Sequence, residues 1–133
     1  MSKIFSLSEA GSIAIHSMVL IAKSENSLNV VKIAERTGAS KHHVAKVLQR
    51  LAKDDFLDSN RGPHGGFRLK RAPDQISLLQ IYEAIEGKIV VNNCPMDNPI
   101  CPFDKCIMGT TITTMTGDFK EYLDTQKLSD YIV

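Results

Sequence analysis

The chain has 133 residues, 43% hydrophobic and 23% charged, and its formal net charge is +1. This length and apolar content suit one folded domain with an appended element, and they exclude a disordered chain. The longest apolar stretch, residues 13–22, is shorter than the roughly 20 residues of a bilayer span. With no signal-peptide pattern at the start, we expect a cytoplasmic protein without a membrane partner.

The two halves of the chain differ in charge. Residues 1–75 hold 12 lysines and arginines against 7 acidic residues, whereas residues 76–133 hold 4 against 8. A basic first half suits contact with a polyanion such as nucleic acid. Chance unevenness in a small protein is the alternative, so motifs in the first half must decide between the two.

The first predicted helix covers residues 7–23. Ser6 and Glu9 have the spacing of a capping box, which satisfies backbone N–H groups at a helix start. Apolar residues then recur at helical spacing; they are Leu7, Ala10, Ile13, Ala14, Met18, Val19, Leu20 and Ile21. We therefore expect a largely buried helix. Within it, His16 is interpreted as a core or interface histidine with a hydrogen-bonded ring rather than as a metal ligand.

Two shorter helices follow in the pattern of a helix-turn-helix. Asn29 is expected to cap the first, Gly38 to end it, and Ser40 to cap the second. Ala34 is small enough to let the two helices approach closely. The expected inward residues are Val30, Val31, Ile33 and Ala34 in the first helix, and Val44, Val47, Leu48 and Leu51 in the second. An ordinary antiparallel helix pair is the alternative.

A hairpin is predicted next, with strands at residues 56–59 and 66–69. Its tip has the sequence Arg61-Gly62-Pro63-His64-Gly65-Gly66-Phe67-Arg68, in which glycines permit positive φ and proline stiffens the bend. Because the tip has little bulk, its arginines can reach bases or phosphates in a narrow groove. A helix-turn-helix followed by such a hairpin is a winged helix, and residues 73–75 are expected to close the wing.

The second half is predicted to contain a helix, a loop and a C-terminal helix. Ser77 and Gln80 form a second capping box for a helix at residues 78–86, which Gly87 ends. Residues 88–107 form a loop. An apolar seam suited to a partner helix follows; its members are Met108, Ile112, Met115, Phe119 and Tyr122. The threonine-rich residues 110–116 also fit a strand, and a short final element is expected at residues 128–132.

Hydrogen-bonding side chains gather on the expected outer side of the second helix of the helix-turn-helix. They are Lys41, His42, His43, Lys46 and Gln49, with Arg50 and Lys53 extending the basic stripe. Such side chains can contact base edges and phosphates in a major groove. A solvated helix face is the alternative, but the neighbouring wing favours DNA contact. His42 and His43 do not converge on one metal ion, because adjacent helical residues point about 100° apart.

Three cysteines carry the second chemical signal. Cys94, Cys101 and Cys106 are separated by six and four residues, with Asp97 and Asp104 between them. An odd cysteine count argues against a disulfide framework in a cytoplasmic chain. Structural zinc sites usually have four ligands in closely spaced pairs, which this spacing lacks. Three thiolates could hold an iron–sulfur cluster; clustered free thiols and a thiol redox switch are the alternatives.

From about residue 7 to residue 131, the chain resembles the IscR/NsrR family of bacterial winged-helix transcription regulators. The matching segments are residues 31–38, the wing at 61–69, residues 76–87 and the three cysteines. The resemblance implies a homodimer, built through a long C-terminal helix, on a roughly palindromic double-stranded operator. It implies a 2Fe–2S or 4Fe–4S cluster on the three cysteines, which tunes DNA affinity in response to redox state, nitric oxide or iron–sulfur status.

The resemblance also implies roles for single residues. It places Arg61 in the minor groove, and it places Ser40, His42, His43 and Lys46 at the major groove. His64, Gly65 and Arg68 are further predicted DNA contacts, which come from the wing sequence itself. The fourth cluster ligand departs from the family pattern. Gly109 stands where the family has a histidine, and the acidic position of the first helix aligns near Ser12. The candidates for the fourth ligand are therefore Glu9, Ser12, His16, Asp97 and Asp104.

The sequence thus predicts a mainly helical fold with a small β-hairpin wing. We expect a winged helix-turn-helix DNA-binding domain at residues 1–75, and a sensor loop with a long dimerisation helix at residues 76–133. The expected function is a transcriptional regulator, most simply a repressor, and not an enzyme, because no phosphate-binding loop or nucleophile elbow is present. A cluster-free regulator, controlled by thiol oxidation or a protein partner, is the alternative. A small iron–sulfur electron carrier or assembly protein is a more distant one.

Overall fold

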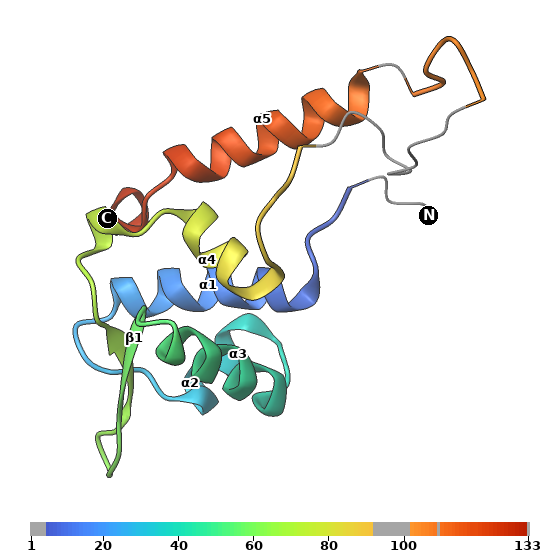
Figure 1. Cartoon of the computed structure of the whole chain (residues 1–133). Helices are drawn as coiled ribbons and strands as arrows, with labels where there is room; N and C mark the ends of the chain where they lie inside the picture. The colour runs from blue at the N-terminus through green and yellow to red at the C-terminus, as the bar shows by residue number, and fades with distance from the viewer. Residues whose placement is uncertain (1–4, 92–101, 109, 133) are drawn as a thin grey trace.

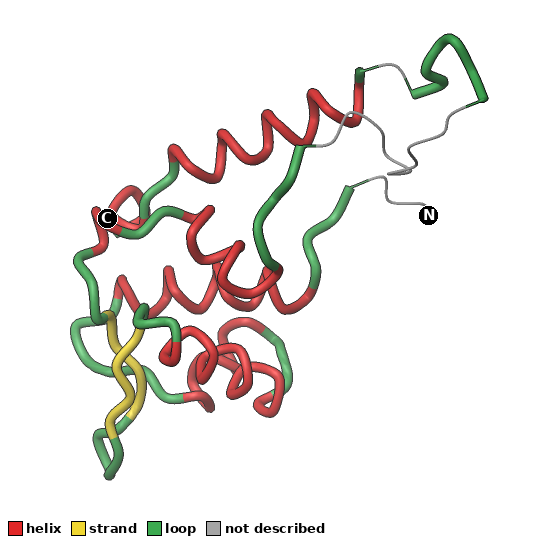
Figure 2. Tube along the Cα trace, viewed as in Figure 1, coloured by secondary structure: helices red, strands yellow, loops and turns green. Residues whose placement is uncertain are grey.

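The computed structural model describes residues 5–91, 102–108 and 110–132 (Figure 1). These residues form a mainly helical fold with one two-stranded hairpin (Figure 2), as predicted. The helices are α1 (Glu9–Lys23), α2 (Val30–Thr37), α3 (Lys41–Lys53), α4 (Leu78–Glu86) and α5 (Thr111–Thr125); the strands are β1 (Leu57–Asn60) and β2 (Gly66–Leu69); the 3-10 turns are η1 (Pro73–Gln75) and η2 (Leu128–Tyr131). No described helix is long and apolar enough to span a bilayer.

Helix α1 lies at the centre, in contact with α2, α3, α4, β2 and η2. It begins two residues later than predicted, because Ser8 is the N-cap: its Oγ accepts the Gly11 N–H at 3.0 Å. The predicted capping box of Ser6 and Glu9 is therefore wrong. Ala14 and Met18 are fully buried on its inward side. A Cβ on Gly11 would lie 3.2 Å from the Tyr82 ring, so a small residue here lets α4 pack closely.

The helix-turn-helix forms as predicted. The Asn29 side chain accepts the Lys32 N–H at 2.9 Å, and the Ser40 Oγ accepts the His43 N–H at 3.1 Å. Gly38 ends α2 at φ +74°, a left-handed conformation that favours glycine. The four predicted inward residues of α3 are all buried. Val31 is the exception in α2, since its side chain is 42% exposed.

The wing is an antiparallel hairpin that runs from the pair Leu57–Leu69 to the pair Asn60–Gly66. Its first strand lies one residue later than predicted. A further bridge fastens the wing to the segment before α2: the Leu28 N–H donates to the Phe67 carbonyl at 3.0 Å, and the Phe67 N–H donates to the Leu28 carbonyl at 2.7 Å. A Cβ on Gly66 would lie 2.5 Å from the Leu28 carbonyl oxygen, so this close approach requires glycine.

Helix α4 has the predicted bounds and the predicted capping box. The Gln80 N–H donates to Ser77 Oγ and the Ser77 N–H donates to Gln80 Oε1, each at 3.1 Å. The buried cluster that contains α1 and α3 side chains also contains Leu78, Ile81 and Ile85 of α4. The core therefore runs without a break past residue 76, and the division into residues 1–75 and 76–133 stays a prediction about function.

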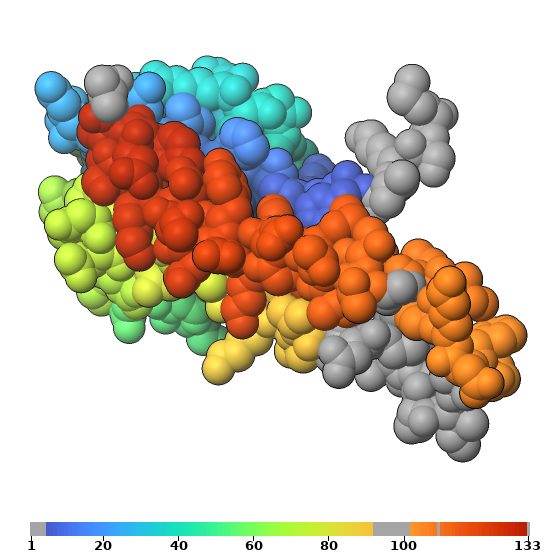
Figure 3. Space-filling model, turned by 90° about the horizontal axis from the view of Figure 1, so that it is seen from above, coloured from blue at the N-terminus to red at the C-terminus, as the bar shows by residue number. Residues whose placement is uncertain are grey.

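The C-terminal helix α5 packs on α4 and lies on the outside of the molecule (Figure 3). Phe119 contacts the Tyr82 ring edge-on, with ring centroids 6.1 Å apart. The strand alternative for the threonine-rich residues is wrong: Thr116 sits within the helix and donates its hydroxyl to the Ile112 carbonyl at 2.8 Å. At 15 residues α5 matches α1 in length, so the described residues do not show an especially long C-terminal helix.

Candidate nucleic-acid interface and cysteine segment

The outer side of α3 carries most of the side chains predicted to contact DNA. Five candidates in and just before the helix are exposed, namely Ser40, Lys41, His42, Lys46 and Arg50. Figure 1 shows α2, α3 and the wing together at one end of the molecule, with α5 at the opposite end. A helix and a hairpin that present cations at the same end can contact one DNA duplex together.

His43 lies differently from its neighbours. Its ring is only partly exposed, and its Nδ1 lies 3.4 Å from the Glu9 carboxylate at the start of α1. The side chain is thus directed toward α1 rather than away from the protein. The sequence could not show this contact, because it depends on how α1 crosses α3.

The tip of the wing is built by close backbone contacts. The Gly65 N–H donates to the Gly62 carbonyl at 2.9 Å, and Gly62 has φ +103°. A Cβ on Gly65 would lie 2.5 Å from the Asn60 carbonyl oxygen. Gly65 therefore shapes the turn, while the candidate side chains Arg61, His64 and Arg68 are exposed around it.

The predicted metal ligands are only partly within the described structure. Cys94, Cys101 and Asp97 lie outside the described residues, whereas Cys106 and Asp104 lie within them and are exposed. Among the described residues, no group of three or more His, Cys, Asp or Glu side chains could hold a metal ion. Whether a cluster fits is therefore judged on donor chemistry: three thiolates match iron–sulfur ligation, in which another residue can complete the set.

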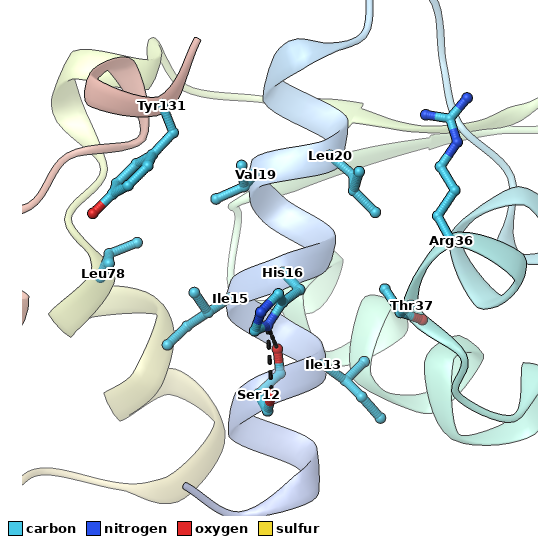
Figure 4. A pocket seen from close by; sticks show the side chains of 10 residues that line it. All are labelled: Ser12, Ile13, Ile15, His16, Val19, Leu20, Arg36, Thr37, Leu78 and Tyr131. Atoms are coloured by element: carbon cyan, nitrogen blue, oxygen red, sulfur yellow. Dashed lines mark hydrogen bonds between the residues drawn. The ribbon is translucent and has the colours of Figure 1, made fainter.

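The candidate fourth ligands on α1 have partners of their own. His16 is exposed, so it is not a core histidine, and its place at an interface stays a prediction; its ring is hydrogen-bonded as predicted. Nδ1 donates to the Ser12 carbonyl at 2.7 Å. Figure 4 shows this ring beside a cavity of about 530 Å³, which is lined mainly by apolar side chains of α1 together with Arg36 and Tyr131. Glu9 is the acidic candidate, and it faces His43.

The start of α1 connects two regions that are distant in the sequence. Ser8 Oγ donates to the Glu86 carboxylate at 2.5 Å, at the end of α4 and just before the cysteine segment. The next residue, Glu9, contacts His43 on α3. Neither contact had a signal in the sequence, since each joins residues more than thirty positions apart.

Comparisons with known proteins agree with this architecture. The sequence profile of Rrf2, described as an iron-dependent transcriptional regulator, matches residues 7–133. The chain is 25% identical over 129 residues to the HTH-type transcriptional regulator IscR of Aliivibrio salmonicida, which covers 96% of this chain and 77% of that protein. It is 28% identical over 123 residues to the HTH-type transcriptional regulator NsrR of Bacillus licheniformis, which covers 86% of this chain and 82% of that protein.

A solved structure shows the same fold. CymR, the global cysteine regulator of B. subtilis, aligns with a TM-score of 0.75 and 23% identity over 97% of both chains. The predicted winged helix is thereby confirmed, and so is the predicted resemblance to IscR and NsrR.

Proposed function

This chain belongs to the Rrf2 family of transcriptional regulators, and on that premise we propose that it represses transcription by binding duplex DNA as a homodimer. The observation that carries the proposal is the position of the basic outer side of α3 and the arginine-bearing wing at one end of the molecule (Figure 1). Lys41, His42 and Lys46 would contact base edges in the major groove, and Arg61 would enter the minor groove.

A dimer would bring two such surfaces to the two halves of a palindromic operator. Support for dimerisation comes from the outer side of α5, where Met115 is 39% exposed and Tyr122 is 54% exposed. These residues belong to the predicted seam, and seven positions separate them, so they lie on one side of the helix. Exposed apolar side chains aligned in this way suit a second copy of the same helix.

We propose that the three cysteines hold an iron–sulfur cluster, which, when bound, supplies a centre that responds to oxidants and nitric oxide. Contacts within the protein would connect the cysteine-containing residues 88–107 to α3. Glu86 ends α4 next to the cysteine segment and accepts from Ser8, and Glu9 contacts His43 of α3. A change in the position of the cysteine-containing residues 88–107 would thereby shift the start of α1 relative to α3, the helix proposed to enter the major groove.

A cluster-free regulator controlled by thiol oxidation is the second candidate. The observation that favours it is the exposed thiol of Cys106, since reversible oxidation requires access from solvent.

DNA binding is tested by gel shift with genomic fragments that include the gene's own promoter. We expect at least one specific fragment and an affinity that falls steeply with salt, because each phosphate neutralised adds about 0.9 to the slope of log K against log salt concentration. If no fragment binds specifically in any redox state, the chain is not a DNA-binding regulator.

The cluster is tested by substituting Cys94, Cys101 and Cys106 one at a time with alanine. We expect each variant, purified anaerobically, to lose bound iron and its visible absorption, while His42→Ala keeps both. A cysteine variant with full iron content would contradict the ligand set. Wild-type protein that lacks iron, but loses DNA affinity reversibly on thiol oxidation, would establish the second candidate instead.

A further inference from the structure

A polar cavity of about 500 Å³ lies between the wing and the start of α2. Three elements provide its positively charged or titratable side chains: Lys32 comes from α2, His64 from the tip of the wing, and Arg68 from β2. All three residues are exposed, so the cavity is open to a ligand from solvent. His64 and Arg68 are among the side chains predicted from the sequence to contact DNA, whereas Lys32 is not.

The walls of this cavity are fixed by backbone contacts. The two hydrogen bonds between Leu28 and Phe67 hold β2 against the segment that leads into α2. The absent side chain of Gly66 permits this approach, and the Asn29 cap fixes the first turn of α2. The wing and α2 therefore hold Lys32 and Arg68 at one cavity without further folding of either element.

The chemistry of the cavity favours an anion. Arginine and lysine bind phosphate well, the first through paired N–H groups and the second as a compact charge. The start of α2 adds the positive end of a helix dipole. One acidic residue, Glu25, also lines the cavity and opposes the two cations. The remaining net charge is positive, which suits one singly charged phosphodiester.

We propose that this cavity binds a single backbone phosphate of the DNA, held by Lys32 and Arg68 together. The proposal rests on the proposed function, since a duplex contacted by α3 and by the wing would lie at the end of the molecule where α2 also lies (Figure 1). One phosphate bound by both elements would fix the position of the wing and of the helix-turn-helix relative to each other along the duplex. Base contacts alone do not fix this position. Glu25 weakens this contact and so limits binding to unrelated DNA.

The experiment measures duplex affinity by fluorescence anisotropy over a range of salt concentrations, first with DNA of arbitrary sequence. The variants are Lys32→Gln, Arg68→Gln, their double variant and Glu25→Gln. Lys105→Gln is the matched control, because Lys105 is an exposed lysine in the described segment 102–108, at the other end of the molecule (Figure 1). Thermal unfolding checks that each variant is folded, which we expect of exposed positions.

The slope of log K against log salt concentration gives the number of DNA phosphates that Lys32 and Arg68 contact. The double variant should lower the slope by about 0.9, which is about eight-fold in affinity at 0.1 M salt, and neither single variant should exceed this value. Two separate phosphate contacts would lower it by about 1.8 and would overturn the shared site. Glu25→Gln should raise affinity about two- to five-fold by the same electrostatic reasoning, and Lys105→Gln should leave it unchanged.

Further arms identify the source of the phosphate. In the tightest duplex selected from random DNA, a neutral methylphosphonate at one position per half-site should weaken wild-type binding but not binding by the double variant. If inorganic phosphate binds wild type but not the double variant, and neither that phosphate nor any methylphosphonate changes DNA affinity, the cavity binds the free anion and the proposal is wrong. Wild-type protein that binds no duplex would refute the proposed function, whereas unaffected variants of a DNA-binding protein refute only the shared site.

Discussion

The residues before 88 and the described residues after 88 differ in how fully they bury their apolar side chains. Among the described residues, ten large hydrophobic side chains are exposed, and eight of them follow residue 88. Only Leu123 and Leu128 of that later part join the buried core. The residues before 88 therefore share one continuous core, whereas the described residues after 88 leave apolar surface for another molecule to cover.

The strongest test of this difference is a truncation within the continuous core. Leu48 is fully buried in α3, and Leu48→Ala should lower the free energy of unfolding by about 2–5 kcal/mol, because it removes apolar contacts and leaves a cavity. Tyr122→Ala, at a half-exposed position of α5, is the control and should change monomer stability by about 0.5 kcal/mol or less. Urea denaturation measures both. Equal losses of unfolding free energy in the two variants would mean that the regions before and after residue 88 are packed alike.

A smaller effect is expected from the wing. Arg61 is exposed, so Arg61→Ala should leave folding intact but weaken operator binding by about 1–3 kcal/mol if the side chain reads bases or a narrow groove. Binding to unrelated duplex should fall by less, and anisotropy titrations with both duplexes separate the two losses. Unchanged operator affinity in a folded variant would show that the wing contacts only the backbone.

The exposed side of α5 gives the next prediction. Met115→Lys should weaken self-association about ten-fold or more, because it would place a charge in an apolar interface, at a cost of at least about 1.4 kcal/mol. Thr114→Lys adds the same charge at an exposed position about a quarter-turn round the helix. It should have the smaller effect in sedimentation equilibrium. If both variants associate like wild type, the apolar surface of α5 has another partner.

The sequence predicted the helix-turn-helix and α4 well because their signals are local. The caps Asn29, Ser40 and Ser77 and the end of α2 at Gly38 each depend on hydrogen bonds within three or four residues. The error at the start of α1 has the same local origin. The capping-box spacing selected Ser6, whereas the side chain that caps α1 is that of Ser8.

What the sequence could not predict depends on contacts across the chain. The pairing of His43 with Glu9, the Ser8–Glu86 hydrogen bond and the cavity that joins Lys32 to Arg68 each bring together residues from different elements. Periodicity also assigned His16 and Val31 to apolar sides that the fold leaves exposed. Helical spacing identifies a side of the helix, but it does not identify which neighbour covers that side.

The smallest expected effect concerns how the wing is fastened to α3. Asp55, in the turn after α3, has φ +66°, and its carboxylate pairs with Lys70 Nζ at 3.0 Å. The hydrogen bond that Lys70 donates to Asp55, followed by the negative charge of Asp55, raises the pKa of Lys70 above its ordinary value of 10.5. A lysine whose pKa is higher in the folded state contributes its full stability below pH 10.5 and loses it as the pH rises through the folded-state pKa.

Asp55→Asn tests this pair, because asparagine also tolerates a positive φ but carries no charge. The wild type should be slightly more stable than the variant at neutral pH, and the difference should shrink above about pH 10.5 as Lys70 loses its proton. Both side chains are largely exposed, so solvent and salt screen the pair and the difference stays small. Lys70→Gln is the control background, in which Asp55→Asn should show no change with alkaline pH. If the wild-type advantage persists undiminished well above the folded-state pKa, the Asp55 turn is stabilised by its backbone contacts and not by the ion pair.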